Sequence, residues 1–520
     1  MIVRSAIRKN TYYDSVTLML ISKEIKKMDG VGEALIGMGT ELNLELVSNL
    51  DMADEAIRTC SPNDFFISVL LEDEALMPAV EAKVEELLNQ KKSSGGSSYR
   101  PVAFENALRM MPEANMVVIS VPGKFAAPEV RKALDNGCHV MLFSDNVALE
   151  DEKALKELAV SKGLLMMGPD CGTSIINNVP LAFANVVRKG PIGIVGASGT
   201  GTQEVSVLVD RFGSGVSQVI GTGGRDLKVE IGGLMMIQSF EALMEDPATR
   251  VIVLISKPPA EEIARKVLNL VKKTHKPVVV HFIGGDPALI REAGAVAGLS
   301  LEDTARKAVA LAEGRTPEDH TGFDLDEASL KALIEGELAG KSPAQKYLRG
   351  LYTGGTLADE AMKLLDKEGW DIWSNIPLKP QWALENVWEA REHTVLDLGD
   401  DQFTVGRPHP MIDPSIRNER LVQDTDAETA VLLMDLVLGY GAHPNPALEL
   451  AVAIRKARRK AEELGGSLTV IASICGTETD PQDLAATRHE LEAAGAVVMP
   501  SNAQAAYLAG RLLSALKAVN

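Results

Sequence analysis

The chain has 520 residues, enough for roughly three to four domains, and its 46% hydrophobic and 24% charged residues are typical of a globular protein. A formal net charge of −19 argues against partners such as nucleic acid or an anionic membrane surface, because like charges repel. No apolar run reaches the ~20 residues that span a bilayer, and residues 1–10 carry early charges in place of a signal-peptide core. We therefore expect a cytoplasmic protein.

The four cysteines are far apart in the sequence, and none belongs to a CxxC pair. This spacing offers neither a disulfide framework nor a zinc site, and it fits a reducing compartment. We expect no metal site.

The N-terminal residues 1–90 are predicted to form a small α/β domain. Apolar residues alternate or run together at 2–7, 32–37 and 65–71, as in strands, and follow helical spacing at 14–28 and 73–90. Residues 91–100 are polar and rich in Gly and Ser, which is typical of a flexible linker.

Strand and helix patterns alternate through three further units, at 101–188, 189–315 and 346–520, with a charged connection at 316–345. This rhythm predicts an α/β fold with several doubly wound parallel sheets of the Rossmann or flavodoxin-like kind. In such sheets ligands bind beyond the carboxyl ends of the strands. We therefore searched the turns that follow predicted strands for ligand-binding residues.

The turn 196–202 (GASGTGT) follows a strand and precedes a helical pattern. Small residues let the backbone approach a ligand, hydroxyls add donors, and the helix start supplies free N–H groups. No Gly-Lys-Ser/Thr follows, so the turn is not a P-loop. It predicts a phosphate or carboxylate cradle, the alternative being an ordinary tight turn. The predicted contacts are Ser198, Gly199, Thr200, Gly201 and Thr202.

The turn 352–358 (YTGGTLA) repeats this design in the last unit, with Gly354, Gly355 and Thr356 between a strand and a helix. Two such turns could hold one anion from opposite sides. The alternative is two independent turns with no shared ligand.

Three other segments offer weaker binding candidates. In GPDCGTS (168–174) the polar or turn-forming residues are Asp170, Gly172, Thr173 and Ser174. Cys171 has no histidine nearby in the sequence and is interpreted as inert packing. Arg225, in GTGGRD, and Lys257, after a buried strand, are candidate anion contacts.

Two histidines in the last unit are candidate catalytic residues. His409 lies between prolines in the string Arg407-Pro-His-Pro, where Arg407 could bind a carboxylate, and His443 follows a long apolar strand. The alternative for each histidine is a hydrogen-bonded loop residue. The carboxylates of residues 397, 400 and 401 are interpreted as part of a turn rather than as metal ligands.

These strings resemble a known family. Residues 120–147 (SVPGKFAAPEVRKALDNGCHVMLFSDNV) with GPDCGTS resemble the CoA-binding portion of the succinyl-CoA synthetase α subunit, and 193–204 (GIVGASGTGTQE) resembles its phosphate-facing helix. LYTGGTLADEA (351–361) is similar to the carboxyl-terminal domain of the β subunit. Over nearly the whole chain, strings such as LDLGDDQFTVGRPHPMIDP (396–414) and ICGTETDPQ (474–482) resemble the FdrA protein family, an acyl-CoA synthetase-like family.

Two departures from the synthetase stand out. No segment is left to form the ATP-grasp domain that loads phosphate. Where the synthetase has a phosphate-carrying histidine in Gly-His-Ala-Gly, this chain reads REAGA (291–295), with Glu292 at the histidine position. We therefore do not expect self-sufficient, ATP-driven CoA ligation.

The resemblance implies a carbamoyltransferase subunit that acts on carbamoyl phosphate and oxamate, giving oxalurate and phosphate, in allantoin (purine) catabolism. It also implies partner protein subunits, and we expect an oligomer with no required cofactor. The alternatives are a component of an acyl-CoA synthetase-like CoA ligase, for which CoA would be the cofactor, and a non-catalytic assembly subunit.

Overall fold

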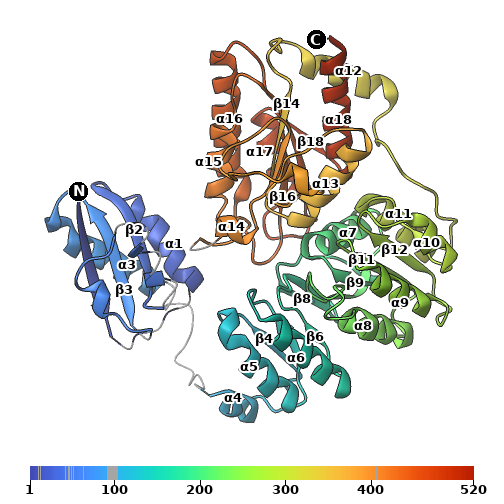
Figure 1. Cartoon of the computed structure of the whole chain (residues 1–520), viewed down its shortest axis with the longest axis horizontal. Coiled ribbons are helices and arrows are strands. Elements are labelled where there is room, and N and C mark those ends of the chain that lie inside the picture. Colours follow the sequence, from blue (N-terminus) through green and yellow to red (C-terminus); the bar gives the residue numbers. More distant parts are fainter. Residues whose placement is uncertain are drawn as a thin grey trace. The chain divides into compact units, whose positions relative to one another are not determined.

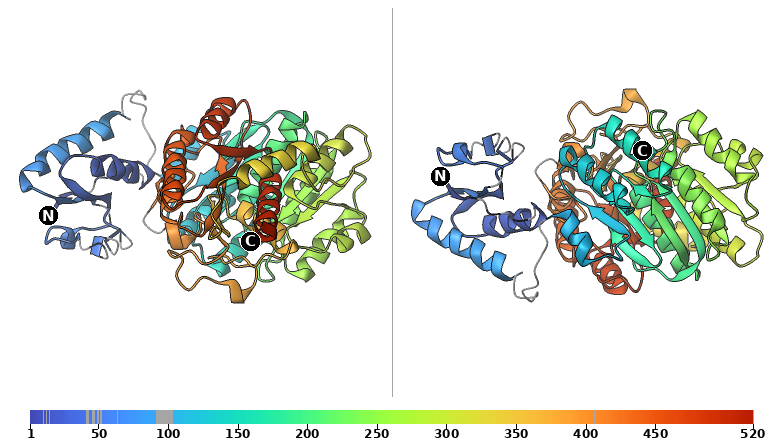
Figure 2. Two further views of the ribbon diagram at one scale, coloured as in Figure 1. Left: turned by 90° about the horizontal axis from the view of Figure 1, so that it is seen from above. Right: turned by 90° about the horizontal axis from the view of Figure 1, so that it is seen from below.

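The computed structural model describes the chain except residues 10, 12, 14, 41, 42, 45, 46, 49, 51, 63, 91–102, 405, 406 and 520 (Figures 1 and 2). The chain divides into two compact units. Unit 1 contains Met1–Pro112 with Asp401–Pro408, and unit 2 contains Glu113–Asp400 with His409–Asn520. Among the described residues no helix is long and apolar enough to cross a membrane.

Unit 1 is built on a three-stranded antiparallel sheet with strand order β1-β3-β2. The central strand β3 reads FFISVLL and is almost entirely buried, because it has a neighbour on each side. Helices α1 and α3 pack their apolar residues against the sheet, and this core includes Leu18, Ile67 and Val84. The elements are β1 (Ile2–Arg8), α1 (Ser15–Lys26), β2 (Val31–Met38), β3 (Phe65–Leu71), α3 (Met77–Gln90), α4 (Phe104–Met110) and α14 (Asp401–Thr404).

Unit 2 begins with a small parallel sheet of order β4-β5-β6. Its elements are β4 (Met116–Ile119), α5 (Gly123–Asp135), β5 (His139–Leu142), α6 (Leu149–Ser161) and β6 (Met166–Met167). The predicted alternation of strand and helix is confirmed here. Helix α5 contains Pro128 within its second turn.

The second sheet of unit 2 has seven strands in the order β13-β12-β11-β9-β10-β7-β8. Five are parallel, and β7 and β8 form an antiparallel hairpin at the edge. The elements are β7 (Thr173–Ile176), β8 (Val179–Ala182), β9 (Lys189–Ala197), α7 (Gly199–Arg211), β10 (Val216–Gly221), α8 (Leu234–Glu245), β11 (Val251–Ser256), α9 (Glu261–Val271), β12 (Val278–Phe282), α10 (Pro287–Glu292), β13 (Val296–Ala297) and α11 (Leu301–Ala312).

The hairpin β7–β8 corrects the sequence analysis, which treated 168–174 as a turn and ended the first doubly wound unit at 188. Asn177 and Asn178 both have positive φ angles, 49° and 66°. Asparagine tolerates this conformation, and two such residues in succession make the tight turn that joins hairpin strands. The second sheet therefore already includes residues 173–182.

The third sheet of unit 2 is five-stranded and parallel, in the order β15-β14-β16-β17-β18. All nine residues of its central strand β16 are buried, as expected for a parallel sheet covered on both faces. Its elements are β14 (Tyr347–Tyr352), α13 (Gly355–Lys367), β15 (Thr394–Asp397), α15 (Ser415–Gln423), β16 (Thr429–Val437), α16 (Pro446–Glu463), β17 (Thr469–Cys475), α17 (Leu484–Ala493), β18 (Ala496–Met499) and α18 (Asn502–Val519).

The connection at 316–345 contains one helix, α12 (Glu327–Leu338), that the sequence analysis did not predict. The Asp326 side chain accepts hydrogen bonds from the N–H groups of Ala328 and Ser329, which caps the helix start. One of the charged residues in this connection, Asp326, therefore marks the start of a helix.

The second and third sheets share one apolar core, to which α7, α11, α13 and α18 all contribute. Polar groups cross the same boundary. Asn185 donates to the Leu438 carbonyl at 3.0 Å and to Asp480 at 2.7 Å. The Leu301 N–H donates to Glu360 at 2.7 Å. These contacts fix the starts of α7 and α13 relative to each other.

Candidate functional site

The two glycine-rich turns meet at the starts of α7 and α13. Ser198 Oγ donates a hydrogen bond of 2.8 Å to Thr356 Oγ1. A Cβ on Gly354 would lie 2.7–2.9 Å from Thr200, and one on Gly201 would lie 2.8 Å from the Thr356 methyl group. Only glycine permits this approach, so the structure brings the predicted turns together at one place.

Neither Ser198 nor Gly354, the residues that precede the two helices, caps its helix with a side chain of its own. The first N–H groups of a helix have no partner within it, and the helix dipole adds a partial positive charge. The junction thus concentrates uncapped N–H groups of two helices, together with the hydroxyls of Thr200 and Thr356, in one spot. This arrangement suits an anion.

Some predicted donors at the junction are already used. The Thr202 hydroxyl donates to the Ser198 carbonyl one turn earlier. Asp435, on β16, accepts hydrogen bonds from the N–H groups of Thr353 at 2.7 Å and Gly354 at 2.8 Å. The donors that remain for a ligand come mainly from the first turn of each helix.

The junction opens to solvent at Gly199. This residue is exposed, and a Cβ built on it meets no atom within 4 Å. Ser198, Thr200 and Thr356 are buried around it. A small anion can therefore reach the α7 side without displacing a side chain.

Two charged side chains flank the start of α13. A Cβ on Gly355 would lie 2.2 Å from Asp397 Oδ2 and 3.4 Å from Lys257 Nζ. Lys257 follows β11, and Asp397 is the last residue of β15. Within the described parts of the chain these two groups form no ion pair at 4.0 Å or less. Lys257, predicted as an anion contact, is therefore placed next to the junction.

Asp397 is missing from the predicted site, and the structure adds it. Burial raises the pKa of Asp397 to about 7, although the charge of Lys257 and a hydrogen bond from the Gly399 N–H oppose this shift. A buried carboxyl that gains and loses its proton near neutral pH suits proton transfer. The sequence signal was a carboxylate at a strand end, which turns also supply.

Two of the three residues predicted to be catalytic, His409 and His443, lie in neighbouring loops of unit 2, since the Met411 carbonyl accepts a hydrogen bond from the His443 N–H at 2.7 Å. His409 is buried, its ring lies 5.5 Å from the Phe183 ring, and burial lowers its pKa to about 4. His443 accepts a hydrogen bond from the Asn445 N–H at 3.2 Å, as expected for a loop residue. Arg407 falls in the 401–408 segment of unit 1, so no contact between it and these histidines is described.

The polar side chains of residues 173 and 174 hydrogen-bond to the backbone of the second sheet and its adjoining loop, and do not line an open ligand-binding turn. The Thr173 hydroxyl donates to the Phe183 carbonyl at 2.7 Å, and Ser174 Oγ accepts from the Gly221 N–H at 3.0 Å. Burial raises the pKa of Cys171 to about 11, which opposes a thiolate. Asp170 is exposed with a φ of 54°, and Gly172 lies beside Phe183.

Arg225 is engaged with protein groups instead of forming an anion clamp. It lies 2.9 Å from Glu152 and donates to the Val147 carbonyl at 2.8 Å. Glu152 also binds the fully buried Lys156, which in turn binds Asp226 at 2.8 Å. This network joins the first and second sheets of unit 2.

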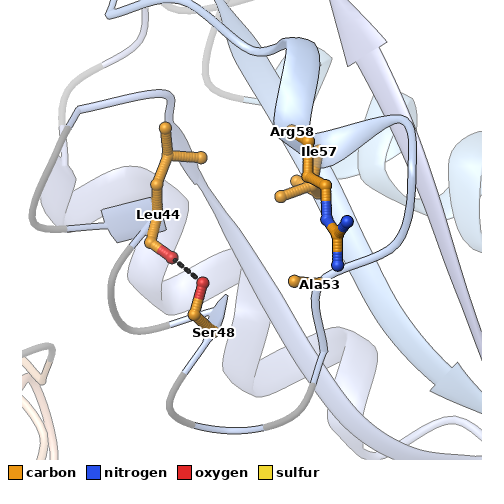
Figure 3. A pocket seen from close by; sticks show the side chains of 5 residues that line it. All are labelled: Leu44, Ser48, Ala53, Ile57 and Arg58. Carbon is orange, nitrogen blue, oxygen red and sulfur yellow. Dashed lines mark hydrogen bonds between the residues drawn. The ribbon is translucent and has the colours of Figure 1, made fainter.

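Two surface hollows are lined by residues that do not belong to the junction. One, of about 330 Å³, is in unit 1 between Leu44, Ser48, Ala53, Ile57 and Arg58 (Figure 3). There the Ser48 hydroxyl donates to the Leu44 carbonyl, and Arg58 supplies a cation. The other, of about 340 Å³, lies at the amino ends of β9 and β11, the opposite end of the sheet from the start of α7.

Comparison with known proteins defines the class to which this fold and junction belong. Residues 351–512 match the CoA-ligase model, and residues 187–284 match the CoA binding domain model. The protein is therefore succinyl-CoA synthetase-like. Residues 1–101 match a model described as "AllF, heavy metal-associated domain".

More particularly, the chain belongs to the family of the Escherichia coli protein YahF. The two are 45% identical over 511 residues, which cover 98% of each chain, and YahF is described as uncharacterized. A succinate–CoA ligase [ADP-forming] subunit alpha 2 from Archaeoglobus fulgidus is 28% identical over 45% of this chain and 75% of its own length. A solved acetyl-coenzyme A synthetase from Ca. Korarchaeum cryptofilum aligns over 78% of this chain and 83% of its own, at 16% identity and a TM-score of 0.32.

These matches support the synthetase-like part of the sequence analysis but not the oxamate part, since none of the descriptions just given names carbamoyl transfer. The CoA binding model also falls on the second sheet of unit 2. The resemblance had placed CoA-binding features at 101–188, and that assignment stays a prediction.

The residues of unit 1 do not fit the metal that its family name mentions. Residues 1–101 contain one cysteine, Cys60, and no histidine. Soft metal ions need several such ligands together. Among the described residues, the one cluster with suitable spacing is Glu302, His320 and Asp324 in unit 2, and Arg306 pairs with both carboxylates there. We derive no chemistry through a metal.

Proposed function

We propose that the α7–α13 junction binds the phosphoryl group of a small acyl phosphate, and that the protein transfers the acyl group between phosphate and an acceptor, as a component of a CoA ligase-like system. One observation carries the proposal. The Ser198–Thr356 hydrogen bond holds two uncapped helix starts against each other, with Lys257 beside them. The likeness to CoA ligases favours a thiol such as that of CoA as the acceptor.

The chain is proposed to receive its substrate already activated. Glu292, at the position where the synthetase carries phosphate on histidine, is an exposed carboxylate at the end of α10. A carboxylate does not replace imidazole as that carrier. Any ATP-dependent step is therefore assigned to a separate partner chain.

Carbamoyl transfer to oxamate is the second candidate, and the same observation favours it. Carbamoyl phosphate is an acyl phosphate that arrives activated from solution, so a chain without its own phosphate carrier could use it. The two candidates share the junction and differ only in the acceptor, a thiol or an amide nitrogen.

The binding step is tested by titrating the full chain with inorganic phosphate and acetyl phosphate in a calorimeter. Gly199→Asp should weaken binding at least about tenfold, because its carboxylate would occupy the place of the anion and repel it. An acidic residue at a helix start favours the helix, so the variant should fold. Gly336→Asp is the matched control, since Gly336 is also an exposed helical glycine with nothing near its Cβ.

The acceptor is tested by phosphate release. Acetyl phosphate with CoA, and carbamoyl phosphate with oxamate, are each supplied to the protein with and without an extract of its source cells. CoA-dependent release supports the ligase-like function, and oxamate-dependent release supports carbamoyl transfer. If wild-type protein binds no phosphate, or if Gly199→Asp binds it normally, the proposed site is wrong.

A further inference from the structure

Asp397 combines deep burial with an unused oxygen. It is 6% exposed, and its Oδ1 accepts the Gly399 N–H at 3.0 Å. Its Oδ2 lies over the first residue of α13 and, in the part of the chain that the structure describes, makes no hydrogen bond. This oxygen can therefore meet a ligand held at the start of α13 without first giving up a protein partner.

An ionised carboxylate at this position would repel a bound anion. A protonated carboxyl would instead donate a hydrogen bond to it, and burial favours that form, since it raises the pKa of Asp397 to about 7. A bound anion favours the protonated form further. The ligand and the proton on Asp397 are therefore expected to bind together.

The charged and titratable groups around Asp397 come from several elements. Lys257, after β11, opposes protonation of Asp397, whereas Asp359 on α13 and Asp400 after β15 favour it. His409 Nε2 lies 2.7 Å from the place of a Cβ on Gly399, next to the same loop. Burial lowers the pKa of His409 to about 4, so its ring stays neutral near pH 7.

We propose that Asp397 is the proton-carrying group of this site: its carboxyl donates a hydrogen bond to the bound phosphoryl group and passes that proton to the phosphate oxygen when the acyl group leaves. This inference rests on the proposed function. It adds the residue that performs the proton transfer, which neither the sequence motifs nor the relatives assign.

The step balances as follows. The acceptor atom forms a bond to the acyl carbon, and the bond between that carbon and the phosphate oxygen breaks. Asp397 gives its proton to the released oxygen, and the carboxylate so formed takes the proton that the acceptor loses. Asp397 ends in its starting state, and no other reactant is needed.

Sulfate binding across pH tests the proposal, because sulfate keeps its double charge in this range. Calorimetry on the full chain compares wild type with Asp397→Asn, which keeps the shape of the side chain. Wild-type affinity should fall about tenfold for each pH unit above 7, since only the protonated carboxyl accepts the anion. Asp397→Asn should bind equally at all pH values, and more tightly than wild type above pH 8.

Asp371→Asn, an exposed carboxylate after α13, is the matched control and should keep the wild-type slope. Lys257→Met should weaken sulfate binding below pH 7, and its affinity should begin to fall at a higher pH than that of wild type, because the charge that opposes protonation of Asp397 is gone. A flat wild-type profile overturns the assignment without any variant, and so does an unchanged slope in Asp397→Asn. If wild type binds no sulfate at any pH, the junction itself is not an anion site, and the proposed function fails with it.

Discussion

Glu204 provides a quantitative test of how unit 2 is held together. It lies on α7, is 2% exposed, and accepts a hydrogen bond from the Asn502 N–H at the start of α18. Burial raises its pKa from an ordinary 4.5 to about 7, and the neighbouring charge of Glu302 adds to the shift. Glu204→Gln keeps the carbonyl acceptor for Asn502 and removes the ionisable group.

The magnitude follows from the size of the pKa shift. Because the pKa of Glu204 is higher in the folded protein than in the unfolded chain, the folded state is favoured while this carboxyl is protonated. The full stabilisation is present below pH 4.5, and it is lost as the pH rises to about 7. A difference of about 2.5 pH units corresponds to about 3 kcal/mol at 1.36 kcal/mol per unit. No discount for solvent screening applies, because the side chain is buried.

The assay is thermal melting of wild type and Glu204→Gln between about pH 5 and pH 8.5. The two proteins should melt close together at the acidic end, and the variant should be more stable by about 3 kcal/mol at the alkaline end. Glu462→Gln, an exposed change on α16, is the control and should follow wild type throughout. Parallel curves for wild type and Glu204→Gln would refute the reasoning.

Two further predictions concern stability. Lys156→Met should destabilise unit 2 by about 3–5 kcal/mol in chemical denaturation, because it leaves the buried carboxylate of Asp226 without its cation and Glu152 with Arg225 alone; a change under about 1 kcal/mol would contradict this. Gly336→Ala should stabilise the same unit by about 0.5–1 kcal/mol, since Gly336 is an exposed helical residue with open space around its Cβ; a lower melting temperature would show that α12 needs glycine.

Features that depend on residues close in sequence could be predicted. The buried strand β16 is recognisable as a largely apolar run. The turns before α7 and α13 are recognisable by glycine and hydroxyl residues between a strand and a helix. The family resemblance then indicated that the two turns belong to one architecture. Such signals are local, because backbone geometry and burial impose them over a few residues.

Features that depend on packing between distant elements could not be predicted. Nothing in the sequence around Asp397 shows that the carboxylate of this residue, at the end of β15, lies next to Gly355 and Lys257. In the same way, the sequence suggested that Arg225 was free to bind an anion, whereas Glu152 from another sheet pairs with it. A charged residue after a strand can serve a ligand or a neighbouring helix, and only the three-dimensional arrangement decides between them.

The connection between β13 and β14, with α12 inside it, has a consequence for how the site assembles. Both helix starts belong to one polypeptide, so their meeting is an intramolecular event with an effective concentration that the connection sets, typically in the millimolar range for short tethers. Dilution does not separate them. Phosphate binding per chain should therefore stay constant down to the lowest protein concentrations at which binding can be measured.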